Sequence, residues 1–359
     1  MKSVIEKPEL LHPIENEVLQ GIRNHTLGPA GSRVLIVDPG EYRASSSIGM
    51  AAALEQAGIR PDDFDHIIVN SSGAFAGVGF AQGRMSEIVQ YCEKTSPRKT
   101  LKFRDIQKRS ILKVEKLLAG MLLGEELQDE HEWYKRNILE KTPQGLGKKP
   151  VIHVVVTTTG ENPQARYIRS DKVSPAEFQK ALAATLTIPR WSEPVRDVEG
   201  QPGIDGYFSD PVMYDYARTL GASYIVKLGN HNGPHLESES SERAVAYWLD
   251  KFPFLAKFYA KKRPHDIHHQ MQRMYTDEAD GKVKILFAEP YPDAFENPLL
   301  TGRKQGFYEN VLAGTQKMKE LISSPHAGLP PLRPIEPKSL IATLEDMITT
   351  LYDYNQIGK

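Results

Sequence analysis

The sequence contains little of what several classes of protein require. Its 359 residues include one cysteine, Cys92, so no disulfide can form within the chain and we expect a reducing, cytoplasmic compartment. The longest apolar stretch, LLAGMLLG (117–124), is too short to span a bilayer, and the N-terminus lacks the apolar core of a signal peptide. The formal net charge of −1 gives no global argument for nucleic acid. We therefore expect a globular protein without a nucleic-acid partner, whose contact with lipid is peripheral.

The apolar residues that are present form short runs separated by helical patterns. Buried strands are predicted over 34–37, 64–69, 151–158, 222–228 and 283–288. Helices are predicted over 45–58, with Ser45–Ser47 as a cap, and over 73–94, 174–186, 212–220, 242–259, 307–322 and 339–352. Residues 201–211 are rich in turn-forming residues. Strands that alternate with helices predict an α/β layered fold with a mostly parallel sheet.

One predicted strand, in HIIVNSSGAFAGVG (66–79), ends in two serines, Ser71 and Ser72. In parallel sheets, functional sites lie at the carboxyl ends of the strands. A serine on a sharp strand-to-helix turn exposes its hydroxyl, and the turn needs small neighbours such as Gly73 and Ala74 because the helix must approach closely. Two interpretations remain open at this point: a nucleophilic serine, or a serine that only caps the following helix.

A nucleophilic serine needs a base, and the best downstream candidate is Asp205 in GIDGYFSDP. Gly203 and Gly206 flank this residue, so the chain can make a tight turn that presents the carboxylate. An Asp-Gly pair is also common in plain turns. Asp205 lies just before another strand–helix unit, which favours a place at the edge of the sheet.

Several segments of the chain resemble one protein family in order and spacing. They are VLIVDPGEYRASSSIGMAAALEQAGI, FDHIIVNSSGAFAGVGFAQGR, ALAATLTIPRWSEPV, PGIDGYFSDPVMYDYARTLGASYIVKL and VKILFAEPYPDAFENPLLTG. The family is that of the patatin-like phospholipases, and the resemblance is greatest to its bacterial branch. It implies a patatin-like three-layer α/β/α fold with a mostly parallel central sheet. It also implies an acyl hydrolase domain over residues 33–325, after a helix and loop extension (1–32) and before a linker and amphipathic helix (326–359).

The resemblance implies a serine acyl hydrolase of the phospholipase A or lipid acyl hydrolase type, acting on lipid esters without a cofactor. An ungapped match places Ser71 at the family's nucleophile position, and Asp205 falls at the general base. The family uses such a Ser-Asp dyad without histidine: the carboxylate accepts the serine proton, the hydroxyl attacks the ester carbonyl, and water later releases the acyl group. Backbone N–H groups near Gly40 and Glu41, and that of Ser72, would hold the oxyanion.

The sequence departs from the family's glycine-rich anion loop, G-G-G-x-R-G. Residues 39–44 read Pro-Gly-Glu-Tyr-Arg-Ala, so only Gly40 and Arg43 match the pattern. Pro39 has no N–H to donate, and Glu41 would bring a carboxylate close to the oxyanion. The loss of one oxyanion donor typically costs about 10²–10³ in rate. A second interpretation is therefore a catalytically impaired protein of the same fold that acts as a lipid-binding or regulatory module.

Two milder departures affect the dyad itself. Val69 stands where the nucleophile pattern G-x-S-x-G has its first glycine. The family's Asp-Gly-Gly motif reads Asp205-Gly206-Tyr207. Neither departure removes the hydroxyl or the carboxylate.

Other features of the sequence carry weaker signals. Segment 94–116 holds nine Lys or Arg residues and would suit an anionic lipid surface, although we favour a solvated helix face that pairs with the acidic segment 124–132. The apolar stripe of helix 339–352 suits packing on its own domain or on a second subunit, which would give a homo-oligomer. Surface positions are the default interpretation of five further residues, so no metal is predicted: His231, His235, His265, His268 and His269.

Overall fold

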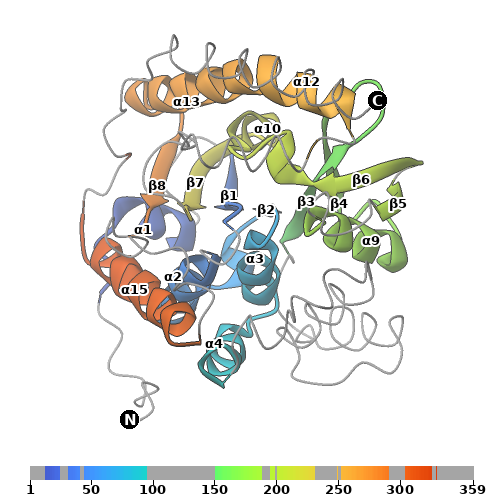
Figure 1. The fold of residues 1–359 in the computed structure, drawn as a ribbon. Coiled ribbons are helices and arrows are strands. Elements are labelled where there is room, and N and C mark those ends of the chain that lie inside the picture. The colour runs from blue at the N-terminus through green and yellow to red at the C-terminus, as the bar shows by residue number, and fades with distance from the viewer. Residues whose placement is uncertain are drawn as a thin grey trace.

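The structure, a computed structural model, describes residues 13–24, 31–40, 44–94, 150–187, 195–198, 200–230, 249, 252–290, 304–325 and 329. Within these residues an eight-stranded sheet lies between layers of helices (Figure 1). The strands are β1 (Ser32–Val37), β2 (His66–Val69), β3 (Val151–Thr158), β4 (Ala165–Arg169), β5 (Val195–Val198), β6 (Gln201–Asp205), β7 (Ala222–Leu228) and β8 (Lys284–Ala288). Their order is β5-β6-β3-β2-β1-β7-β8, and β4 pairs with β3 beside this path.

The centre of the sheet is parallel and one side of it is antiparallel. Strands β3, β2, β1, β7 and β8 run parallel to their neighbours in that series. Strands β4 and β6 pair with β3 in the antiparallel sense, and β5 pairs with β6 in the same way. The predicted α/β class with a mostly parallel central sheet is confirmed.

Successive residues of each central strand are buried on opposite faces of the sheet. In β1, Leu35 and Val37 belong to one hydrophobic cluster, whereas Val34 and Ile36 belong to a second. Since both faces are covered by helices, these strands are continuous apolar runs rather than alternating ones. This explains why they could be recognised in the sequence.

The helices form a layer on each side of the sheet (Figure 1). The first cluster contains buried residues of α1 (Glu17–Asn24), α2 (Ala44–Gln56), α3 (Gly73–Ala81), α4 (Met85–Lys94), α9 (Pro175–Thr185) and α15 (Lys304–Ile322). The second contains residues of α10 (Tyr214–Thr219) and α13 (Arg263–Ala279). Helix α12 (Pro253–Lys261) packs on the end of β6 and on the 3-10 turn η4 (Gly206–Phe208). A second 3-10 turn, η2 (Pro61–Asp63), precedes β2.

Several details differ from the sequence prediction. The sequence does not predict strands β4 and β5 or helix α13, and of the helix predicted over 242–259 the described residues form a helix only from Pro253, the first residue of α12. The single helix predicted over 73–94 is two helices, because Gly83 adopts a left-handed φ of 64° between α3 and α4. Ser45–Ser47 lie inside α2 and do not cap it. The turn-rich segment 201–211 begins with β6, where Gly203 lies closely against Val156 and Val198.

Several predictions fall on parts of the chain outside the described residues. They include Glu41, most of the basic segment 94–116, the acidic segment 124–132, two of the histidines, and the helix over 339–352. The predicted division at residues 32 and 325 stays a prediction. Within the first predicted part, α1 buries Leu19 and Ile22 in the first cluster beside β7.

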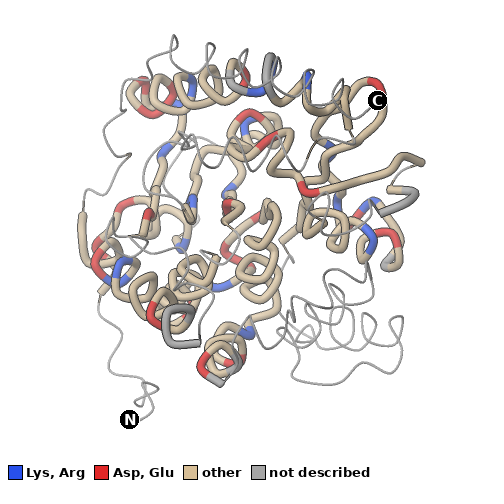
Figure 2. Tube along the Cα trace, in the orientation of Figure 1, with Lys and Arg blue, Asp and Glu red and all other residues tan. Residues whose placement is uncertain are grey.

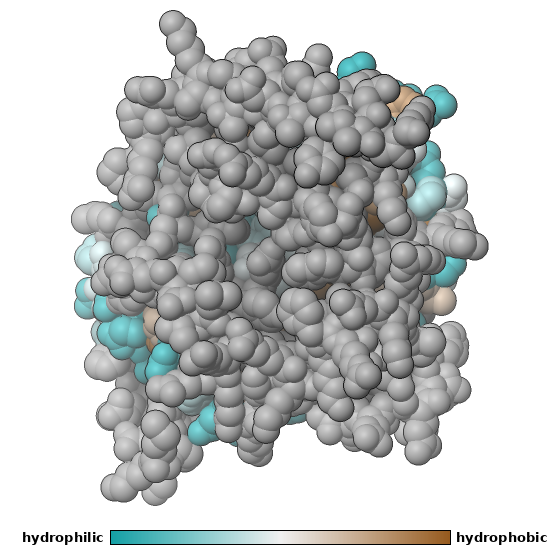
Figure 3. Space-filling view, in the orientation of Figure 1, coloured by the Kyte–Doolittle hydropathy of each residue, from teal (hydrophilic) through white to brown (hydrophobic). Residues whose placement is uncertain are grey.

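Figures 2 and 3 show how charged and apolar residues are distributed over the described chain in one view of the molecule. Acidic and basic residues are mixed over the helices, with neither sign collected on one face (Figure 2). The described residues visible at the edges of the molecule in Figure 3 are mostly hydrophilic. In the part of the chain that the structure describes, no helix is both long and apolar enough to cross a membrane.

Candidate active site

The ends of three neighbouring parallel strands meet at one edge of the sheet. Val37 of β1 pairs with Val69 of β2 on one side and with Leu228 of β7 on the other. The loops that follow, 38–40 and 70–72, therefore leave the sheet side by side. This edge is where ligands bind in open α/β sheets.

The register of the sheet brings Asp205 to the level of Ser71. Val69 pairs with Val154 of β3, whereas Asp205 pairs with Val156, which lies two residues further along the same strand. Two residues beyond Val69 is Ser71. Two side chains far apart in the sequence thus come to one end of the sheet because β3 pairs with both β2 and β6.

Ser71 has the backbone conformation that a nucleophile at a sharp turn requires. Its φ is 52°, in the left-handed region that non-glycine residues rarely adopt. Its N–H donates to Oγ1 of Thr185 at 2.8 Å. Gly73 permits the close approach of α3, since a Cβ there would lie 2.5 Å from the carbonyl oxygen of Asp38. The side chain of Ser71 is buried at the base of this turn.

The structure brings Ser71 and Asp205 into direct contact. The Ser71 hydroxyl donates to Oδ2 of Asp205 at 2.6 Å, and both residues are buried. The other carboxylate oxygen, Oδ1, accepts the N–H of Tyr207 at 2.9 Å. The backbone N–H of Asp205 donates to the carbonyl of Thr187 at 3.0 Å. This arrangement can transfer a proton from the hydroxyl to the carboxylate without an imidazole between them.

Val69, in place of the family's elbow glycine, is accommodated by the helix that follows it. A Cβ on Gly77 of α3 would lie 2.3 Å from Cγ1 of Val69. The space that the extra valine side chain needs is therefore provided by the absence of a side chain at position 77.

The three oxyanion candidates are only partly described. The N–H of Gly40 donates to Oγ of Ser72 at 3.3 Å, so these two residues lie together beside the dyad. Gly40 also contacts Asn230 so closely that a Cβ would lie 2.3 Å from the Cβ of Asn230. Glu41 is outside the described residues, and the oxyanion role of all three stays a prediction.

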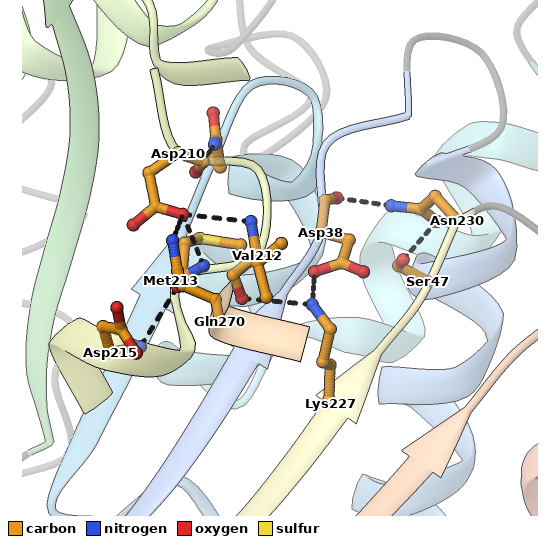
Figure 4. A network of polar contacts seen from close by, with 10 residues as sticks. Asp38, Ser47, Asp210, Val212, Met213, Asp215, Lys227, Asn230 and Gln270 are labelled. Carbon is orange, nitrogen blue, oxygen red and sulfur yellow. Dashed lines mark hydrogen bonds and ion pairs between the residues drawn. The ribbon is translucent and has the colours of Figure 1, made fainter. Parts of the chain in front are cut away.

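A buried ion pair supports the loop that carries Gly40 (Figure 4). The ammonium group of Lys227 on β7 contacts the carboxylate of Asp38, and the two side chains are 2% and 1% exposed. The backbone carbonyl of Asp38 accepts the amide of Asn230, whose oxygen in turn accepts the Ser47 hydroxyl. Both ends of Asp38 are thereby fixed next to the candidate site.

The same polar network continues from Lys227 to Val212 and Asp210 (Figure 4). Lys227 also donates to the carbonyl of Val212 at 3.4 Å, and the N–H of Val212 donates to Asp210 at 3.1 Å. The backbone carbonyl of Asp210 accepts the side-chain amide of Asn70 at 2.9 Å. Asn70 immediately precedes Ser71, so the network links both loops at this edge.

Two histidines of the sheet, half-buried His66 on β2 and buried His153 on β3, lie in a chain of polar contacts. A ring nitrogen of His153 lies 3.0 Å from one of His66, and its other ring nitrogen lies 2.9 Å from the hydroxyl of Tyr216. Burial, and then the charges of His66 and Arg169, lower the pKa of His153 to about 3. His153 is therefore neutral at physiological pH.

Other features of the described chain lie apart from the dyad. A cavity of about 970 Å³ between β4, α10 and α13 is lined by residues such as Tyr167, Asp210 and Gln270, and by none of the predicted site residues. His265, His268 and His269 lie on α13. Among the described residues, no three His, Cys, Asp or Glu side chains are grouped as a metal ion would require.

Sequence reasoning missed the residues that hold the dyad in place. Thr185 and Thr187 lie in ALAATLTIPR, a segment that carries a predicted helix and a family resemblance but no predicted role in the site. Lys227 lies inside an apolar strand. An isolated lysine within a buried strand run is the one local signal that a buried partner is needed.

The fold and the contact between serine and aspartate define an α/β protein with a hydroxyl–carboxylate pair at the end of its sheet. A family model described as patatin-like phospholipase matches residues 39–218, which is half of the chain. The chain belongs to the patatin-like phospholipase family, which confirms the resemblance seen in the sequence and supports a lipid hydrolase function.

Two solved structures are similar to the chain at low identity. The crystal structure of VipD from Legionella pneumophila matches at 13% identity with a TM-score of 0.39, over 92% of this chain and 76% of that one. Human GIVD cytosolic phospholipase A2 matches at 14% identity with a TM-score of 0.27, over 44% of this chain and 24% of that one. No curated protein matches the chain.

Proposed function

We propose that the chain is a serine acyl hydrolase that cleaves ester bonds of lipids, with Ser71 as nucleophile and Asp205 as general base. The single observation that carries the proposal is the 2.6 Å hydrogen bond from the Ser71 hydroxyl to the Asp205 carboxylate, at a left-handed turn. Membership of the patatin-like phospholipase family supports a lipid ester as the substrate.

The reaction proceeds in two halves that use the same two side chains. Asp205 accepts the hydroxyl proton while Ser71 Oγ attacks the ester carbonyl, and the tetrahedral intermediate carries a negative oxygen. Its collapse expels the alcohol, which takes the proton from Asp205, and leaves an acyl-serine. A water molecule then gives a proton to Asp205 and attacks the acyl carbon, which forms a second tetrahedral intermediate. Its collapse releases the fatty acid, and Ser71 Oγ leaves and takes the proton back from Asp205.

The oxyanion needs donors at the same edge of the sheet. We assign this role to backbone N–H groups of the loop at Gly40 and Glu41 and to that of Ser72. Pro39 supplies no donor, so fewer N–H groups serve this loop than in the family's glycine-rich form. We therefore expect turnover slower than a full set of donors would give.

The proposal is tested by hydrolysis of a fluorescent short-chain ester and of a phospholipid in vesicles. Ser71→Ala removes the nucleophile and Asp205→Asn removes the base, so both reduce turnover to background. Ser72→Ala is the matched control: it removes the neighbouring hydroxyl but keeps the backbone N–H assigned to the oxyanion, so it should retain measurable turnover.

Two results would contradict the proposal. Turnover by Ser71→Ala equal to that of the wild type would exclude Ser71 as nucleophile. A wild type that binds lipid vesicles but hydrolyses neither substrate would favour the catalytically impaired lipid-binding module instead.

A further inference from the structure

A buried arginine lies next to the loop that presents Asp205. Arg263, at the start of α13, is 3% exposed. Its guanidinium lies between two aromatic rings, 4.6 Å from the ring centre of Tyr207 and 4.3 Å from that of Tyr259. Its Nε donates to the backbone carbonyl of Tyr207 at 3.2 Å. Arg263 therefore contacts both the ring and the backbone carbonyl of Tyr207.

Tyr207 connects this arginine to the dyad. Its backbone N–H donates to Oδ1 of Asp205 at 2.9 Å, and Oδ2 of the same carboxylate accepts the Ser71 hydroxyl. The carbonyl of Tyr207 thus accepts from Arg263, while the N–H of Tyr207 donates to Asp205. A shift of Tyr207 would rotate the carboxylate away from the hydroxyl.

The large side chain of Tyr207 is held beside Asp205 by its packing on Arg263. Tyr207 stands where the family has the second glycine of Asp-Gly-Gly, so a large side chain must be placed beside the general base. The ring is covered on one face by the guanidinium, and a desolvated contact of this kind is strong. Ile204 and Phe208, which flank this turn, pack with Leu255 and Tyr259 of α12. The turn is thereby seated between α12 and the first residue of α13.

We propose that Arg263 is a positioning residue for the general base: it fixes Tyr207, whose N–H holds Asp205 so that Oδ2 faces Ser71. The inference rests on the proposed function and extends it to a residue outside the family's motifs. Arginine suits this position because its planar guanidinium contacts both rings while its Nε donates to the carbonyl, whereas a lysine ammonium is a flexible point charge.

The test compares two arginines on the same helix. Arg263→Met removes the guanidinium but keeps an apolar side chain of similar length. Arg273→Met is the matched control, since Arg273 has a side chain 59% exposed and pairs with Asp215 at the surface. A misplacement of about 1 Å at a reacting group costs on the order of 10² in rate, so we expect kcat for the ester to fall about 10- to 100-fold in Arg263→Met.

KM should change less than about 2-fold in the same variant, because Arg263 is buried and acts through Tyr207. Arg273→Met should match the wild type in both kcat and KM. The rate of Ser71 labelling by a fluorophosphonate should fall in parallel with kcat. Arg263→Lys should recover only a small part of the loss. A purely structural role would change the amount of folded protein and leave kcat per folded molecule unchanged.

A second variant keeps the inference testable if Arg263→Met folds poorly. Tyr207→Leu removes the ring but keeps the backbone groups, so it should also lower kcat. The double variant Arg263→Met/Tyr207→Leu should lower kcat by less than the product of the two single reductions, because both changes disturb the same contact. An active wild type with unchanged kcat in both single variants would overturn this inference alone. A wild type without turnover or labelling would overturn the proposed function and this inference with it.

Discussion

At the scale of single residues, the site depends on a serine held in an unfavourable backbone conformation. A non-glycine residue at a φ of 52° costs on the order of 1 kcal/mol or more and persists only where its surroundings enforce it. At Ser71 these surroundings are Thr185, which accepts its N–H, and Gly73, which admits the helix. In this left-handed turn the Ser71 hydroxyl donates to Asp205 at 2.6 Å.

Thr185→Val tests this support, since valine has the shape of threonine without the accepting oxygen. The buried N–H of Ser71 would lose its partner, at a cost of about 1–3 kcal/mol. We expect kcat for an ester to fall at least about 10-fold and the melting temperature to fall. Thr185→Ser keeps the oxygen and should retain most of the activity. Equal activity of the two variants would show that this hydrogen bond does not position the nucleophile.

A second prediction at this scale concerns pH. The pKa of His153 is lowered to about 3 in the folded chain, whereas an unfolded histidine titrates near 6.5. Between these values the unfolded chain binds the extra proton, so the free energy of unfolding decreases as pH falls below about 6.5. From pH 7 to pH 5 this group should account for a loss of about 2 kcal/mol.

Urea unfolding at the two pH values measures this loss. His153→Gln removes the titrating ring and should show a correspondingly smaller difference between pH 7 and pH 5. An identical pH dependence in wild type and variant would contradict the assignment.

At the scale of elements, the unit β2–turn–α3 shows how a departure from the family pattern is accommodated. Val69 ends β2 and its side chain fills the space beside Gly77 on α3. Two glycines, Gly73 and Gly77, let the helix lie against the strands from its first turn. The small-residue composition of this helix therefore has a packing reason that is independent of catalysis.

Gly77→Ala should destabilise the fold. In an exposed helix, replacing glycine by alanine stabilises by up to about 1 kcal/mol. Here the new Cβ would lie 2.3 Å from Val69 Cγ1, and overpacking of a core typically costs about 1–3 kcal/mol. In the double variant Val69→Ala/Gly77→Ala the clash is absent, so the two changes should cost less than their sum in urea unfolding. Additive costs would contradict this packing.

The elements that could be predicted from sequence are those whose environment is uniform. The five parallel strands are buried on both faces and appear as apolar runs, whereas β6 begins with exposed residues and contains Pro202 and Gly203, which suggest a turn. The site could be predicted at Ser71 and Asp205, where short motifs carry the signal. Thr185 and Arg263 could not, because their roles come from contacts between distant segments, such as the 114 residues that separate Thr185 from Ser71.

At the scale of the whole molecule, the central strands are mostly apolar, and a buried ion pair lies at the edge of the sheet that carries the candidate site. Lys227 and Asp38 join the central strands β7 and β1 just where the candidate oxyanion loop leaves the sheet (Figure 4). The ring of Phe287 on β8 lies 5.6 Å from the ammonium group. The pair thus couples the stability of the sheet to the placement of the loop.

Lys227→Met should be strongly destabilising, because it leaves the Asp38 carboxylate buried without its charge partner. Loss of one partner of a buried pair typically costs about 3–5 kcal/mol. The double variant Asp38→Leu/Lys227→Met removes both charges and should recover much of the free energy of unfolding. Its ester turnover should stay low, because the pair that places the loop is still missing. A single variant as stable as the wild type in urea would contradict the role of the pair.

The most direct test of the central claim is to identify the residue that reacts. We predict that a fluorophosphonate probe modifies the wild-type chain once, that peptide mass spectrometry places the label on Ser71, and that Asp205→Asn slows labelling at least about 100-fold, as expected for loss of a general base. A label on Ser72, or labelling of equal rate in Asp205→Asn, would contradict the dyad.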